Sequence, residues 1–304
     1  MQEPLFGFEW NQMDAPAEIE EGLFTVVAKD STDVYHSVGT GFVIKALSDV
    51  AFAVSAAHVF AEVQRLQRKG NLLSHVTTLP EFAPLPPPIN VSLAGLAMLT
   101  RSNSRVVVSA VDALAFDEAG DVGVVQLRPQ NGQESEFPLR EFILEDEMPK
   151  TGQLVCVASY LNLACRNDDT GAFKVERQAV LRVGKVLEVF PTGQRLCRGP
   201  CFETTIPMTS GMSGGPVFHY GTSGAMRVIG LVCSDPDLDG PLKNDRSVAG
   251  RSLIARLPVR RLSGTAQGKQ QVVLSFVPNA VAGQFANFDG AQFWASSRSE
   301  SITG

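Results

Sequence analysis

The feature that most constrains the fold is a long succession of short runs rich in Val, Ile and Phe, each bounded by turn residues. The first series comprises LFTVVAK, VGTGFVIKA, VAFAVSAAHVF, RVVVSAVDALAF and DVGVVQL. After a polar break near Arg128 to Glu136, a second series follows, with QLVCVASY, QAVLRVGKVLEV, CFETTIPM, GPVFHY and MRVIGLVCS. β-branched and aromatic residues favour strands. The two series therefore predict two β-barrels or sheets packed side by side.

Helical patterns are few. The segment HVFAEVQRLQRKG has apolar residues at helical spacing and ends in glycine, so we expect a short helix after His58. A second helix could begin at LPVRRLSG, near residue 257. In the last forty or so residues, QQVVLSFV predicts one strand, and we expect the Ser/Gly-rich tail after it to be mobile.

Charge and cysteine content narrow the classes of partner and compartment. A formal net charge of −6 argues against nucleic acid as a partner, because phosphate binding needs a basic face. The acidic N-terminus lacks an apolar signal region and no apolar run reaches the length of a membrane span, so we expect a cytoplasmic protein that does not bind membranes. An odd number of cysteines (five) fits reduced thiols. The pair in CRGPC has no second Cys/His pair at metal spacing, so neither a zinc site nor a cofactor is expected.

The segment SGMSGGP contains the strongest chemical signal. Ser213 has glycine two positions before it and two glycines after it. Glycine lets the backbone turn its N–H groups toward one point, where they can stabilise the oxyanion of an acyl-transfer reaction. We interpret Ser213 as a nucleophile and the N–H groups of Gly211 and Ser213 as oxyanion donors. A glycine-rich hairpin turn is the alternative.

A serine nucleophile needs a base, and the base needs an oriented acceptor. His58 ends an apolar run and has small residues beside it, and Asp121 stands directly before an alternating apolar strand. The competing residues are His36, His75, His219, Asp112 and Asp117. Asp117 precedes a glycine turn and looks exposed.

Taken together, these motifs resemble those of the chymotrypsin/trypsin-like serine peptidases. GTGFVI, SAAHV, DVGVVQL, SGMSGGPV and VIGLVCS occur in that family's order over about residues 23–262. The resemblance implies an all-β fold of two antiparallel six-stranded barrels, with the active site between them and few short helices. It also implies that Ser213 is the nucleophile, His58 the general base and acid, and Asp121 the orienting carboxylate, with Gly211 and Ser213 as oxyanion donors.

Three positions depart from the secreted branch of that family. Val59 and Thr209 stand where that branch has cysteines, and Met212 replaces the aspartate that pairs with a newly cut N-terminus. The sequence is more similar to the bacterial HtrA-like branch, in which RSLIARLPVRRL would form a strand and a helix that close the barrel. Too few residues follow for a PDZ domain, so we expect a peptidase domain that is controlled by other means.

The resemblance also suggests a specificity pocket. Pro207 replaces the aspartate with which trypsins bind basic side chains, which favours a small or medium apolar residue at the cut site. The remaining pocket residues would be Leu231, Val232, Cys233 and Ser234. The acidic run that follows, Asp235, Asp237 and Asp239, could instead attract basic residues. It also matches the start of a calcium loop, although Arg246 stands where that loop needs glutamate, so calcium binding is only a weak candidate.

The predicted organisation is an N-terminal arm (1–22), a peptidase domain (23–262, with barrels at about 23–130 and 137–262) and a partly disordered extension (263–304). We expect an intracellular serine endopeptidase that acts on protein or peptide substrates and is gated by a partner protein or ligand. Candidate contacts are the proline-rich insertion PLPPPINV, the C-terminal tail and the exposed arm with Phe6, Phe8 and Trp10. The alternative is an inactive binding module with the same fold.

Overall fold

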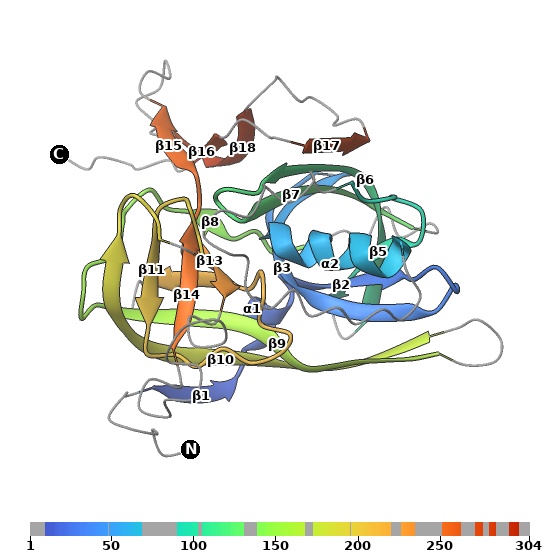
Figure 1. Cartoon of the computed structure of the whole chain (residues 1–304), viewed down its shortest axis with the longest axis horizontal. Coiled ribbons are helices and arrows are strands. Elements are labelled where there is room, and N and C mark those ends of the chain that lie inside the picture. The colour runs from blue at the N-terminus through green and yellow to red at the C-terminus, as the bar shows by residue number, and fades with distance from the viewer. Residues whose placement is uncertain are drawn as a thin grey trace.

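The computed structural model describes residues 10–47, 49–68, 90–102, 105–130, 139–167, 173–194, 196–219, 226–234, 251–262, 271–275, 280–283 and 292–297. Two barrels lie side by side, with the first strand below the second barrel and the last strands above both in the view of Figure 1. The predicted architecture is confirmed: both barrels are closed, antiparallel and six-stranded.

The first barrel is built from the first series of apolar runs. Its strands are β2 (Leu23–Lys29), β3 (Tyr35–Ala46), β4 (Ala51–Ala56), β5 (Leu96–Ser102), β6 (Arg105–Asp117) and β7 (Val122–Pro129). They pair in the order β6-β5-β2-β3-β4-β7, and pairing of β6 with β7 closes the barrel. β4 and β7 run side by side, with Ala56 opposite Val122, so the segments that follow β4 and precede β7 meet at one end of the barrel.

The second barrel uses the second series. Its strands are β9 (Leu154–Asn167), β10 (Phe173–Phe190), β11 (Cys201–Thr204), β12 (Pro216–His219), β13 (Arg227–Ser234) and β14 (Ser252–Arg256). They pair in the order β10-β11-β14-β13-β12-β9, and β9 closes back onto β10. Two short strands join this sheet: β1 (Asn11–Asp14) pairs with β10, and β8 (Ile143–Leu144) pairs with β13 in parallel.

The predicted helix after His58 is present as α2 (Ala57–Arg68) and begins one residue earlier. Its buried residues recur at helical spacing, so one face packs on the first barrel (Figure 1). The other helix is the single turn α1 (Ala17–Glu20). No helix in the described part of the chain is long and apolar enough to cross a bilayer.

The helix predicted at LPVRRLSG is wrong. Val259–Leu262 forms strand β15, which pairs with β16 (Gln271–Ser275), the strand predicted from QQVVLSFV. A four-residue run cannot complete a stable helix, whereas β16 offers it a full ladder of hydrogen bonds. The remaining strands are β17 (Ala280–Gly283), which pairs with β6, and β18 (Gln292–Ser297), which pairs with β16.

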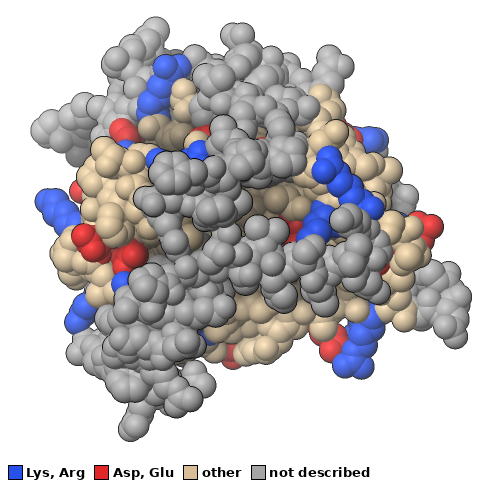
Figure 2. Space-filling view, viewed as in Figure 1, with Lys and Arg blue, Asp and Glu red and all other residues tan. Residues whose placement is uncertain are grey.

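The core joins the two barrels. One cluster of buried apolar side chains includes residues of both, such as Phe42 of β3 and Tyr160 of β9. A second cluster lies within the second barrel and includes Ile206 and Met212, which flank the segment that leads to Ser213. This segment therefore starts from a packed core. Charges of both signs are interspersed on the face shown in Figure 2.

Candidate active site

His58 and Asp121 are brought together by the meeting of β4 and β7. His58 lies in the first turn of α2, directly after β4, and Asp121 lies in the turn before β7. The His58 ring nitrogen Nδ1 is 2.8 Å from Asp121 Oδ2. Asp121 is buried, whereas 42% of the His58 side chain is exposed. The Asp121 carboxylate thus holds the Nδ1 edge of the imidazole ring, and much of the rest of the side chain is exposed to solvent.

Asp121 also caps the helix that carries His58. Its Oδ1 accepts the His58 backbone N–H at 2.9 Å, and its carbonyl oxygen accepts the Ala57 N–H at 3.1 Å. Both donors are first-turn N–H groups that have no partner within a helix. Asp121 adopts a left-handed backbone conformation (φ 53°), which is uncommon for a residue other than glycine. One strained residue therefore fixes both the start of α2 and the orientation of the His58 ring.

The segment around Ser213 is a tight double turn. Met212 N–H donates to Thr209 O at 3.1 Å, and Gly215 N–H donates to Met212 O at 2.9 Å. The Met212 side chain is fully buried, whereas Ser213 is half-buried. Gly211 has φ +94°, and a Cβ there would meet Tyr160 O at 2.8 Å, so only glycine fits. Within the described residues, the N–H groups of Gly211 and Ser213 donate to no acceptor, so both are available to a bound substrate.

Thr40 ties this segment to the first barrel. Its N–H donates to Ser213 O at 2.9 Å, and its Oγ1 donates to Gly211 O at 2.6 Å. The same hydroxyl accepts the Tyr160 N–H at 3.1 Å. Thr40 thus holds the carbonyl groups of both candidate oxyanion residues and leaves their N–H groups free. The role of Thr40 was not predicted, although it belongs to the GTGF run.

The three candidate residues therefore converge where the two barrels meet. A Cβ at Gly39 would contact both Val59, the neighbour of His58, and Ser213 O, at 2.8 and 3.2 Å. Within the described residues, no hydrogen bond joins His58 Nε2 to Ser213 Oγ. Catalytic hydrogen bonds are often long before substrate binds. The three residue types are those of a serine nucleophile with a histidine base and an orienting carboxylate, and the side-chain contact that the structure shows among them joins His58 and Asp121.

The comparison with protein families agrees with this geometry. Residues 39–231 match the model of the trypsin-like peptidase domain. The chain belongs to the trypsin-like peptidase family. No curated protein sequence matches it.

Solved structures with a similar fold are distant from this trypsin-like peptidase domain. Protease Anisep from Arthrobacter nicotinovorans has 11% identity and a TM-score of 0.48, over 81% of this chain and 93% of that one. The MamO protease domain from Magnetospirillum magneticum has 11% identity and a TM-score of 0.43, over 79% and 94%. Rv3671c from M. tuberculosis has 16% identity and a TM-score of 0.40, over 80% and 89%. These identities are too low to inform on function.

The competing histidines lie away from Asp121 or outside the described residues. His36 Nε2 is 2.8 Å from Asp30 in the turn between β2 and β3. His219 ends β12, is buried, and its Nδ1 is 2.9 Å from Gln153 Nε2. His75 lies outside the described residues. The first two contacts are structural, so His58 is the candidate base of this trypsin-like domain.

Neither competing aspartate contacts His58. Asp112 forms an ion pair with Arg128, with 3.1 Å between Oδ2 and Nε. Asp117 accepts the Gly120 N–H at 3.2 Å and is half-buried, not exposed as the glycine turn suggested. Burial raises the pKa of its carboxyl group above the usual value. Asp117 therefore helps to shape the turn that presents Asp121.

A group of three cysteines adjoins Asp121. The Cys197 thiol donates to Gly199 O at 3.6 Å, and the Cys201 thiol donates to the Cys197 carbonyl oxygen at 3.8 Å. Interaction with the neighbouring Cys201 and Cys233 thiols lowers the pKa of the Cys197 thiol, whereas interaction with Cys197 raises the pKa of the other two thiols. Cys233 was predicted only as a pocket wall, and it lies at the register shift between Val232 and Ser234 of β13, which no sequence pattern shows.

The predicted specificity pocket stays a prediction. Leu231 and Val232 are fully buried in the core, and the half-buried Pro207 is engaged through its carbonyl group. Ser234 ends β13 opposite Leu253. The acidic residues Asp235, Asp237 and Asp239 lie outside the described residues, and so does the proline-rich run up to residue 89. Within the described ranges, no cluster of His, Cys, Asp or Glu is arranged to hold a metal.

The environment of His58 predicts how activity depends on pH. Partial burial lowers the pKa of the imidazole, but attraction to Asp121, the hydrogen bond with it and attraction to Glu62 outweigh that effect, so the pKa lies above 6.5. A base must be neutral to accept a proton, so activity should rise with pH through a midpoint above 6.5. Replacing Glu62 by Gln removes one attraction and should lower the midpoint.

A pH profile of the acylation rate checks this expectation. The matched control is Glu141→Gln, which removes the ion pair between Lys45 and Glu141 on the first barrel and should leave the midpoint unchanged. A midpoint at or below 6.5, or one that does not move in Glu62→Gln, would contradict the assignment of His58 as the base.

Proposed function

We propose that this chain is a serine endopeptidase that cleaves protein substrates through an acyl-enzyme. The observation that carries the proposal is the contact of 2.8 Å between His58 Nδ1 and Asp121, at the barrel junction that also holds Ser213. The carboxylate fixes the tautomer with the proton on Nδ1, which leaves Nε2 as the proton acceptor. The presence of all three residue types argues against the alternative of an inactive binding module.

The proposed reaction has two balanced halves. Ser213 Oγ attacks the scissile carbonyl carbon while His58 Nε2 takes the hydroxyl proton, and the N–H groups of Gly211 and Ser213 bind the oxyanion. Collapse of this intermediate breaks the C–N bond, and His58 returns the proton to the departing amine. Water then attacks the acyl-enzyme with His58 again as base, which releases the carboxylic acid and restores Ser213.

The proposal extends to substrate class, location and control. An apolar pocket from Pro207 to Ser234 would accept small or medium apolar residues. We place the enzyme inside the cell because all five cysteines are free. The absence of a His58–Ser213 hydrogen bond in the described residues fits an enzyme whose site closes when substrate, a partner protein or a ligand binds. We also propose that this peptidase is more similar to the HtrA-like branch than to the secreted branch of the family.

Digestion of an unfolded protein such as casein tests the proposal. We expect new peptide ends, mapped by mass spectrometry, with the wild-type chain and none with Ser213→Ala. Ser92→Ala is the matched control, because Ser92 is an exposed serine near the end of α2 and should be dispensable. Binding of casein without cleavage by the wild type would favour the inactive binding module instead.

A further inference from the structure

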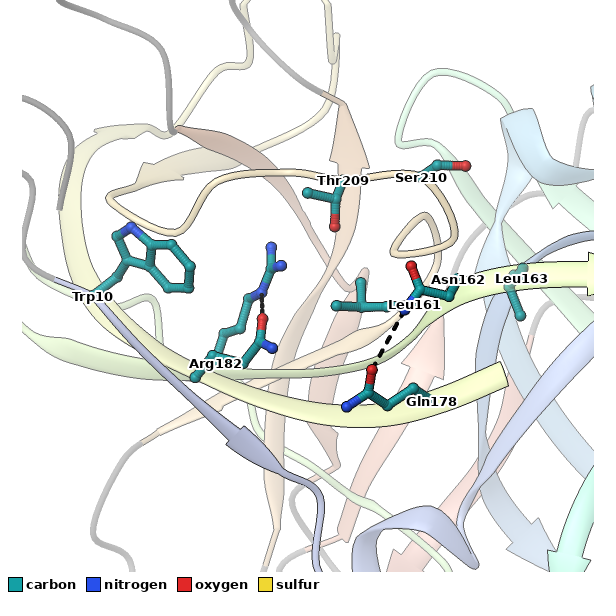
Figure 3. A pocket seen from close by; sticks show the side chains of 9 residues that line it. Trp10, Leu161, Asn162, Leu163, Gln178, Arg182, Thr209 and Ser210 are labelled. Atoms are coloured by element: carbon teal, nitrogen blue, oxygen red, sulfur yellow. Dashed lines mark hydrogen bonds between the residues drawn. The ribbon is translucent and has the colours of Figure 1, made fainter. Parts of the chain in front are cut away.

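A cavity of about 600 Å³ lies beside the segment that leads to Gly211 (Figure 3). Its lining includes Thr209 and Ser210 of that segment, Leu161 from β9, Arg182 from β10, and Trp10 next to β1. A cavity offers no packing contacts to the chain that borders it. On the cavity side, the position of this segment, called the loop below, must therefore depend on the side chains that reach it from β10.

Arg182 is such a side chain. It is only 4% exposed, and Figure 3 shows it extending from β10 toward the loop that carries Thr209. Its Nη1 donates to Pro207 O at 2.5 Å and lies 3.1 Å from Met212 Sδ. The same sulfur accepts the Thr209 N–H at 3.3 Å. Arg182 thus contacts both ends of the loop, and Met212 is the residue between the two candidate oxyanion donors.

The N-terminal strand fixes Arg182 from the other side. Arg182 Nε donates to Gln12 Oε1 of β1 at 2.8 Å, and its guanidinium carbon lies 5.1 Å from the centroid of the Trp10 ring. β1 is itself paired with β10, with Gln12 opposite Arg182. The sequence suggested that Trp10 lies on an exposed arm, but its side chain is half-buried. The arm, Arg182 and the loop form one connected chain of contacts.

The charge of Arg182 is costly for stability alone. Among the described residues it has no carboxylate partner, and burial lowers the pKa of the guanidinium to about 10. A buried charge without an opposite charge destabilises a fold, and an apolar side chain of the same length would pack there at lower cost. A residue that is unfavourable for stability is expected where it serves function.

We infer that Arg182 is a positioning residue that holds the N–H groups of Gly211 and Ser213 in place for the oxyanion, and that β1 holds Arg182. This inference rests on the proposed function. Arg182 touches neither substrate nor reacting atoms, and it acts through Pro207 and Met212. The stabilisation of the oxyanion by these two N–H groups therefore depends on a strand that lies about 200 residues earlier in the chain.

The test compares Arg182→Met with Arg177→Met. Arg177 is a matched control on the same strand: it donates to Thr25 Oγ1 and Leu99 O of the first barrel and lies over the Tyr160 ring of β9, and no hydrogen bond within the described residues joins it to the loop. We expect Arg182→Met to slow fluorophosphonate labelling about 10- to 100-fold, less than the loss of a direct oxyanion donor. The turnover number for a peptide should fall with KM nearly unchanged, and the midpoint of thermal unfolding should stay or rise.

Two further measurements keep the inference testable. Arg182→Lys should recover part of the lost rate, because an ammonium can still donate to Pro207 O. Hydrogen–deuterium exchange over residues 207–213 should quicken in Arg182→Met and not in Arg177→Met. Unchanged exchange and labelling in Arg182→Met would overturn the inference, as would a loss of labelling that merely follows a loss of stability in both variants.

The two proposals fail differently. If the wild-type chain is not labelled at all, the proposed function is contradicted, and the exchange experiment alone still decides whether Arg182 holds the loop. If the wild type is labelled and Arg182→Met reacts at the same rate, only the positioning role is lost.

Discussion

Replacing Asp121 by Asn should lower the rate of acylation by about 10⁴-fold without unfolding the protein. The amide oxygen of the new side chain can still accept the His58 backbone N–H, so α2 keeps its cap. The amide NH₂ group, however, faces Nδ1 where a carboxylate oxygen stood 2.8 Å away. Nδ1 must then act as the acceptor, and Nε2 carries the proton and cannot take one from Ser213. The measurement is the second-order rate constant of fluorophosphonate labelling.

Asp112→Asn provides the control for this effect. It removes a carboxylate that is paired with Arg128 on the surface, nine positions earlier in the chain, and should leave labelling within about twofold because surface ion pairs contribute little. Circular dichroism should show that both variants are folded. A loss smaller than about tenfold in Asp121→Asn would show that Asp121 does not orient the base.

The second large effect is structural. Gly214→Ala should lower the free energy of unfolding by about 3–5 kcal/mol, from left-handed backbone strain and overpacking together. Gly214 has φ +82°, and a Cβ there would overlap Thr40 O and Ser55 Oγ and lie 2.9 Å from Ala56 N. These atoms belong to β3 and β4, so the two barrels would be forced apart at the site. Urea denaturation measures the loss.

Gly152→Ala is a closely matched control. Gly152 also has φ +82°, but a Cβ there would meet nothing within 4 Å. It therefore isolates the backbone strain, about 1 kcal/mol. Equal losses in the two variants would show that the contact between the loop and the first barrel is loose, and the proposed oxyanion geometry would lose its main support.

The three candidate catalytic residues could be named from the sequence because each sits in a local pattern. Glycines around Ser213, small residues around His58 and the turn before Asp121 are short-range features, and the strands that flank them have clear apolar patterns. The closure of both barrels follows from the same patterns once the resemblance to the peptidase family is noticed. None of these features depends on which distant residues touch.

The parts that could not be predicted depend on long-range pairing. Residues 259–262 form a strand only because β16 lies beside them, and a short apolar and basic run does not distinguish strand from helix. The link from Trp10 through Arg182 to Met212 joins three segments that no motif relates. Cys233 lies at a bulge in β13, which shifts the side chains of a strand relative to a regular pattern.

The most direct test of the central claim is the site of fluorophosphonate labelling, located by mass spectrometry of peptides from the wild-type chain, with Ser213→Ala and His58→Ala beside it. We expect one label on Ser213 in the wild type, no label in Ser213→Ala, and almost none in His58→Ala, because a serine hydroxyl without a base is a weak nucleophile. A label on any other residue, equal labelling of Ser213→Ala, or an unlabelled wild type would contradict the assignment of this chain as a serine endopeptidase.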